Sequence, residues 1–190
     1  NKYFIIIRIN YKMVNIFLIA NNPNINIFNM KKINYNQDDI IVRFNHMDNF
    51  KLFNGKTDIL FIRFKNPVHF KIRNSVKKYN KLSSFDLNYI GKYELIKKIL
   101  IEKNINEKKN LNNYRKYIHN HLGYSPSTGF IAISYLINNF KLDYKKNIDN
   151  IFLVGFTFHK NEQKNHYWHN FDLEEKIINN FKNDYNIVYI

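Results

Sequence analysis

The chain has 190 residues, a formal net charge of +15, 45% hydrophobic residues and no cysteine. This length predicts one domain with a sizeable core, and the lack of cysteine excludes disulfide frameworks, cysteine–zinc sites and thiol catalysis. Most of the basic residues are lysines scattered along the chain, among many Asn and Ile residues. A specific nucleic-acid interface is therefore not expected, because it would cluster arginine and aromatic residues on one face. Attraction to an anionic substrate or to a membrane surface remains open.

No apolar run approaches the roughly 20 residues that a membrane-spanning helix needs, and the first 20 residues lack a small-residue cleavage site. Met13, followed by an apolar segment, looks like a chain start. We therefore expect a single domain over residues 13–190, with residues 1–12 as an extension outside the fold. The expected location is the cytoplasm, with peripheral association at the inner face of the membrane as an option.

The hydrophobic pattern predicts alternating strands and helices. In chain order, strands are expected at Val14–Ala20, Ile40–Phe44, Ile59–Phe64 and Val68–Ile72, and residues 74–92 are expected to be mostly loop. Next come helices at Tyr93–Ile101 and Asn106–Leu122, the latter ending at Gly123, and a helix at Gly129–Phe140 capped by Ser127 or Thr128. A strand at Ile151–Phe156, a helix at Leu173–Phe181 and a strand at Asn186–Ile190 complete the chain. This alternation predicts an α/β fold: a single Rossmann-like domain with a mainly parallel sheet flanked by helices.

Several familiar catalytic motifs are missing from the sequence. It has no Gly-rich dinucleotide turn and no GxxxxGK[ST] segment, which disfavours nicotinamide enzymes and P-loop NTPases. It also has no DxD pair, the metal clamp of many nucleotide-sugar enzymes, and no GxSxG elbow, which disfavours an α/β hydrolase.

Residues 124–178 hold the best candidate site. The turn Ser125–Gly129 opens into an apolar helix, and the strand Ile151–Phe156 leads into a polar loop that ends in His166-Tyr167-Trp168-His169. Turns at helix N-termini and loops at strand C-termini are where open α/β sheets bind phosphorylated ligands. The sequence therefore predicts an active site here.

Four short motifs in this region resemble, in order, those of the sialyltransferase family. They read Pro126-Ser127-Thr128-Gly129, Val154-Gly155-Phe156, His166-Tyr167-Trp168, and His169 followed five residues later by Glu174. The first half agrees more loosely, at Ala20-Asn21-Asn22-Pro23, Val42-Arg43-Phe44-Asn45 and Gly55-Lys56-Thr57-Asp58. The motifs are of the mammalian type in a short, bacterial-like form, and are also similar to bacterial lipooligosaccharide sialyltransferases. The resemblance runs from about Met13 to the C-terminus.

The resemblance implies a sialyltransferase-type glycosyltransferase fold and a metal-independent, inverting transfer. Sialic acid would move from CMP-sialic acid to a hydroxyl of a glycan or glycolipid, with no cofactor and no metal site. His169 is the candidate general base, because an imidazole has a pKa near neutrality. His166 and Tyr167 would hydrogen-bond the departing phosphate. The remaining implied site residues are Ser127, Thr128 and Gly129 for the phosphate or the sugar carboxylate, Asn22 and Asn45 for the donor, and Glu174 as an orienting partner.

Other interpretations stay open at this point. The donor could be CMP-Kdo, or the chain could be a catalytically inactive relative that binds a nucleotide or a sugar. The HYW and H-x4-E motifs are fused here, and the disulfide that joins the two halves of mammalian members cannot form. Taken alone, the histidines fit an ordinary surface loop or half of a zinc site, and the Ser-Thr-Gly turn fits an ordinary helix cap. A basic nucleic-acid-binding domain is the remaining alternative.

Overall fold

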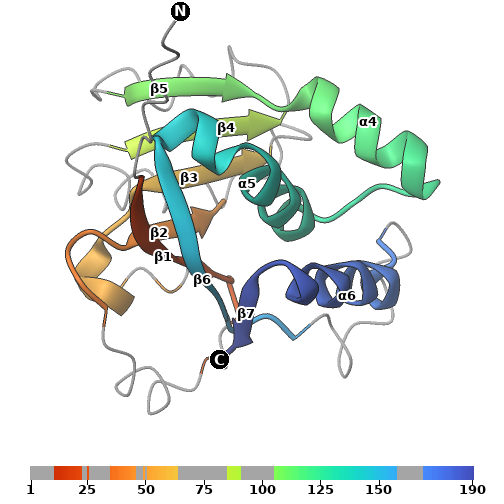
Figure 1. The fold of residues 1–190 in the computed structure, drawn as a ribbon. Helices are drawn as coiled ribbons and strands as arrows, with labels where there is room; N and C mark the ends of the chain where they lie inside the picture. The colour runs from red at the N-terminus through yellow and green to blue at the C-terminus, as the bar shows by residue number, and fades with distance from the viewer. Residues whose placement is uncertain are drawn as a thin grey trace, which may run out of the picture.

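The structure is a computed structural model that describes residues 11–22, 25, 35–45, 49, 51–63, 85–90, 105–157 and 169–190. The described residues form a seven-stranded sheet of order β5-β4-β3-β2-β1-β6-β7, and every neighbouring pair of strands is parallel (Figure 1). The strands are β1 (Lys12–Ile19), β2 (Ile40–Phe44), β3 (Ile59–Arg63), β4 (Phe85–Ile90), β5 (Ile105–Asn110), β6 (Lys146–Val154) and β7 (Asn186–Tyr189). The predicted α/β class with a mainly parallel sheet is confirmed.

The central strands are apolar because both of their faces are covered. Along β1, Val14, Ile16 and Leu18 pack on one face of the sheet, and Phe17 and Ile19 pack on the other. This alternation follows from the two-residue period of a strand, and a strand buried on both faces gives a continuous apolar run.

Three helices cover the first of these faces: α4 (Asn112–Leu122), α5 (Thr128–Tyr144) and α6 (Phe171–Asn180). They lie on the same side of the sheet (Figure 1). The most buried helix is α5, whose run from Phe130 to Leu136 has no exposed residue. On the opposite face, the 3-10 helix η1 (Leu52–Gly55) contributes Leu52 and Phe53 to the second apolar cluster.

The strand order reverses beside β1. Strands β2 to β5 follow one another on one side of β1, whereas β6 and β7 lie on its other side. In open parallel sheets, ligands bind outside the carboxyl ends of the strands at such a switch point. In this fold the switch point lies between the ends of β1 and β6, near Asn21, Asn22 and Gly155.

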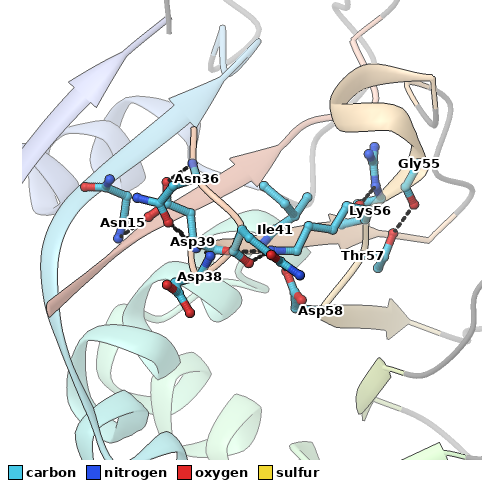
Figure 2. A network of polar contacts seen from close by, with 11 residues as sticks. Asn15, Asn36, Asp38, Asp39, Ile41, Gly55, Lys56, Thr57 and Asp58 are labelled. Atoms are coloured by element: carbon cyan, nitrogen blue, oxygen red, sulfur yellow. Dashed lines mark hydrogen bonds and ion pairs between the residues drawn. The ribbon is translucent and has the colours of Figure 1, made fainter. Parts of the chain in front are cut away.

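At the opposite, amino edge of the sheet, acidic side chains tie the strands together (Figure 2). The Asp39 carboxylate accepts a hydrogen bond from the backbone N–H of Asn15 at 3.1 Å, and the Asp58 carboxylate accepts one from Ile41 at 2.7 Å. The Lys56 ammonium donates to the carbonyl of Asp39 and lies 3.4 Å from the Asp58 carboxylate. The Gly-Lys-Thr-Asp segment that resembles a sialyltransferase motif is therefore part of the strand scaffold, at the edge away from the switch point.

Five predicted strands and two predicted helices are present in the structure. The strands expected at Val14–Ala20, Ile40–Phe44, Ile59–Phe64 and Asn186–Ile190 are confirmed within two residues at each end, as is the helix expected at Leu173–Phe181. The strand expected at Ile151–Phe156 and the helix expected at Gly129–Phe140 are also present, but the strand begins earlier, at Lys146, and the helix ends later, at Tyr144. Gly123, with φ 73°, caps α4 as expected. The strand expected at Val68–Ile72 and the helix expected at Tyr93–Ile101 lie outside the described residues. So do residues 1–10 of the extension expected over residues 1–12, but Lys12 belongs to the fold, because it begins β1 and pairs with Lys146 of β6.

One prediction was wrong, and another missed a strand. The segment 74–92, expected to be mostly loop, contains β4, in which Leu87 and Tyr89 are buried, and the rest of the segment lies outside the described residues. The helix expected over Asn106–Leu122 is a strand, β5, up to Asn110, and α4 begins only at Asn112. The apolar helical spacing starts at Leu111. The residues before it are polar, which an edge strand with one neighbour tolerates.

Candidate functional site

Asparagine side chains close the loops at the switch point. Asn22 donates from Nδ2 to the carbonyl of Gly155 at 3.1 Å, which links the end of β1 to the end of β6. Asn21 donates to the carbonyl of Phe44, and Asn49 donates to the carbonyls of Ala20 and Asn22. These bonds position the backbone of three strand ends, so the predicted donor-binding residue Asn22 lies where a ligand is expected.

Asn45 follows β2 with a positive φ of 41°, a conformation that Asn tolerates better than most residues. Its Oδ1 accepts a hydrogen bond from the backbone N–H of Arg63 at 2.9 Å, so it joins the ends of β2 and β3. Two residues earlier, Arg43 is 1% exposed and donates to the carbonyls of Lys56, Asn49 and Leu52. Burial lowers the pKa of Arg43 to about 10, partly offset by the Asp58 carboxylate. Arg43 therefore holds the η1 segment in place.

The N-terminus of α5 is capped and bonded to α6. Ser127 is the N-cap, and its Oγ accepts the backbone N–H of Phe130 at 3.1 Å. Its own backbone N–H and hydroxyl donate to the two oxygens of the Glu174 carboxylate, at 2.7 and 2.6 Å. The protein's own carboxylate thus occupies the two donors of Ser127 that were predicted to bind a ligand anion.

Glu174 lies in the first turn of α6 and has no exposed surface. Burial raises its pKa to about 7. The two hydrogen bonds from Ser127 and the charge of Arg63 oppose this rise, because they favour the ionised form. At neutral pH the carboxyl therefore exchanges between its charged and neutral forms.

His169 lies against the turn that precedes the α5 cap. Its Nδ1 is 2.5 Å from the carbonyl oxygen of Ser125. A carbonyl oxygen only accepts, so Nδ1 carries the proton, and Nε2 is the proton acceptor of the neutral ring. The half-buried ring is thereby held in the tautomer that a general base at Nε2 requires.

Two guanidinium groups converge on the same turn. Arg63, the last residue of β3, donates from Nη2 to Ser125 Oγ at 3.0 Å and from Nη1 to the carbonyl of Pro126 at 3.1 Å. Arg115, on α4, donates from Nη2 to Ser125 Oγ at 3.3 Å. Burial is the main cause that lowers the pKa of Arg63 to about 10, and the charge of Arg115 lowers it further. The Glu174 carboxylate opposes this shift.

Glycines allow the end of β6 to approach the start of α5. A Cβ atom at Gly129 would lie 2.9 Å from Cε1 of Phe156, so only glycine leaves room for that ring. Gly155 has a φ of 71°, and a Cβ atom there would lie 2.4 Å from Cγ1 of Ile25. These contacts explain both glycines of the Ser-Thr-Gly and Val-Gly-Phe motifs by close packing.

The structure brings Ser127, Thr128, Gly129, His169 and Glu174 together around the start of α5. Asn22 and Asn45 lie at the same carboxyl edge of the sheet. His166, Tyr167 and Trp168 lie outside the described residues.

Sequence reasoning missed Ser125, Arg63 and Arg115 as site residues. The position of Arg63 at the carboxyl end of a predicted strand was a usable signal, because the other candidates follow strands at the same edge. Arg115 lies within a helix and gave no such signal.

No protein-family model matches the chain, and a search of curated proteins finds no match either. The resemblance to the sialyltransferases therefore depends on the motifs and on their arrangement. Among the residues that the structure describes, no cluster of three or more His, Asp and Glu side chains could hold a metal ion. In the same part of the chain, every helix is too short or too polar to cross a membrane.

Proposed function

We propose that the chain is a glycosyltransferase that moves sialic acid from CMP-sialic acid to a hydroxyl of a glycan or glycolipid. One observation carries the proposal: the Ser-Thr-Gly turn and the H-x4-E segment meet, although Ser127 and Glu174 are 47 residues apart. His169 contacts the same turn through Ser125. The meeting point lies at the carboxyl edge of a parallel sheet, where such folds bind nucleotides.

In this reaction His169 is the general base. Nε2 takes the proton from the acceptor hydroxyl as its oxygen attacks the anomeric carbon of the sugar. The bond between that carbon and the phosphate oxygen breaks, and CMP leaves with the electron pair. The phosphate is a good leaving group, so the step calls for a positioned base with a pKa near the working pH. Attack on the face opposite CMP inverts the anomeric centre.

The donor is expected to lie across the switch point. The backbone N–H groups at the start of α5, from Thr128 and Gly129, favour an anion because of the helix dipole. Asn22 and Asn45 supply amide groups at the ends of β1 and β2, near the expected position of the nucleotide. Glu174 positions the turn by holding Ser127, and through that turn it affects where His169 lies.

The test is a transfer assay with CMP-sialic acid and a lactose-type acceptor. We expect the His169→Ala variant to lose a factor of roughly 10²–10⁴ in turnover, the usual contribution of a general base. His121→Ala is the matched control, because that ring is exposed and bonds to Tyr117 in its own helix. Full transfer activity in His169→Ala would remove His169 from the mechanism. A wild-type chain that does not bind CMP would remove the whole proposal.

An inactive nucleotide- or sugar-binding relative is the second candidate. It is favoured by the bonds between Glu174 and Ser127, because they occupy donors that a transferase is expected to offer to its substrate. Stabilisation by CMP without turnover would indicate this candidate. Turnover with CMP-Kdo in place of CMP-sialic acid would keep the mechanism and change the donor. Salt-sensitive binding to RNA or DNA with no response to CMP would indicate a nucleic-acid-binding domain instead.

A further inference from the structure

We propose that Arg63 and Arg115 form an anion subsite that holds the carboxylate of the donor sugar, an assignment that rests on the proposed function. Both guanidinium groups reach the hydroxyl of Ser125, one from the end of β3 and one from α4. They therefore meet beside the turn that leads into α5, on the side where His169 contacts the carbonyl of Ser125.

The balance of charge beside Ser125 favours an anionic ligand. Neither arginine forms an ion pair among the residues that the structure describes, and the one carboxylate acting on Arg63 is that of Glu174. Two guanidinium groups thus meet at Ser125, whereas the Glu174 carboxyl that acts on Arg63 is itself neutral part of the time near pH 7. An added carboxylate would balance the second guanidinium, and arginine suits this role because its planar fork matches a carboxylate.

Buried donor atoms beside Ser125 also favour a ligand that accepts hydrogen bonds. Within the described residues, the Arg115 side chain makes one hydrogen bond, the 3.3 Å contact with Ser125, and its buried Nε has no partner there. The hydroxyl of Tyr124, next to Ser125 in the chain, is likewise buried without a partner there. Burial, and secondly the Glu174 carboxylate, raises the pKa of Tyr124, so the phenol remains a donor. Buried donors without acceptors are costly, and an anionic ligand would remove that cost.

The Glu174 carboxylate occupies the alternative position for the sugar carboxylate. The resemblance assigned that group to the Ser-Thr-Gly turn, but the N–H and hydroxyl of Ser127 bond to Glu174. CMP-sialic acid carries two anionic groups, a phosphodiester and a carboxylate. The N–H groups of Thr128 and Gly129, assigned above to the donor, can take one of them, and the arginine pair is the neighbouring cationic group for the other.

Arg115→Gln is the sharper variant for the test, because Arg63 also supports the backbone at Pro126. Lys116→Gln is the matched control, since it makes the same charge change at an exposed position one residue along α4. Calorimetry without acceptor measures the binding of CMP and of CMP-sialic acid to each protein. We expect Arg115→Gln to bind CMP-sialic acid roughly tenfold to a hundredfold more weakly, the range for a lost hydrogen bond to a charged group, and to bind CMP as before.

Equal weakening toward both ligands would overturn the assignment to the carboxylate and give the arginines to the phosphodiester. No weakening beyond that of Lys116→Gln would overturn the subsite. If the wild-type protein binds neither ligand, the proposed function fails, and sulfate then tests the subsite separately. The melting temperature is then compared in sulfate and in chloride at equal ionic strength. A larger rise with sulfate in the wild type and in Lys116→Gln, but not in Arg115→Gln, supports the subsite. The same rise in all three proteins would overturn it.

Discussion

Replacement of Glu174 by glutamine is expected to change how stability depends on pH. The carboxyl has no exposed surface and accepts two hydrogen bonds from Ser127, so it joins α6 to the start of α5. Glutamine has nearly the same shape and can accept the backbone N–H of Ser127 through its carbonyl oxygen. The substitution therefore removes a titrating group and keeps most of the packing.

The size of the effect follows from the pKa of Glu174, which burial raises from 4.5 to about 7. The folded state then holds the proton more tightly than the unfolded state does. The contribution of the protonated Glu174 carboxyl to stability is therefore complete below pH 4.5. As the pH rises from 4.5 through 7, the free energy of unfolding falls by about 3 kcal/mol, at about 1.36 kcal/mol per pH unit. Above that range the loss is constant.

Urea unfolding followed by circular dichroism from pH 4.5 to 8 measures this contribution. We expect the stability of Glu174→Gln relative to wild type to rise by about 3 kcal/mol across that range. The control is Asp172→Asn, which exchanges an exposed carboxylate for an amide in the same turn of α6. Its difference from wild type is subtracted at each pH. Parallel pH profiles for wild type and Glu174→Gln would refute the reasoning.

Further substitutions test the packing around the site. Gly155→Ala is expected to cost about 3 kcal/mol or more in unfolding free energy, because it combines a positive φ with a Cβ position 2.4 Å from Ile25. Gly123→Ala, with a similar φ and open space, is expected to cost only about 1 kcal/mol in the same urea experiment, and equal costs would contradict the clash. Arg43→Lys is expected to cost about 3 kcal/mol, because an ammonium cannot reproduce the fork that donates to three carbonyls. A melting temperature unchanged in Arg43→Lys would show that those bonds contribute little.

The sheet was predictable from the sequence where its strands are covered on both faces. Strands β1, β2 and β3 have runs of buried residues, which leave a continuous apolar signal. Strand β4 lacks that signal because polar residues interrupt its sequence FDLNYI, including Asn88, which is 1% exposed. Strand β5 has the sequence INEKKN, and parallel pairing with β4 gives it a structure that its composition does not predict.

The candidate site was predictable only in part, for a physical reason. Ser127 has the signature of a helix cap and Glu174 that of an acidic residue in a first helical turn, and both assignments hold locally. That the two side chains bond to each other depends on the packing of α5 against α6, across 47 residues of chain. The motifs placed both residues in one site, but neither periodicity nor capping signals predict the bond between them. The convergence of Arg63 and Arg115 on Ser125 likewise depends on how β3 and α4 come together.

The bonds between Glu174 and Ser127 link the stability of the fold to the charge of the site. When the carboxyl is ionised, its charge offsets that of Arg63. When it is protonated, that offset to the charge of Arg63 is lost. An anionic ligand at the arginine pair therefore binds more tightly to the protonated form, so bound ligand raises the proton affinity of Glu174 by linkage. A carboxyl with a pKa of about 7 makes this exchange at neutral pH, whereas an ordinary glutamate would stay ionised and hold the site at a lower positive charge.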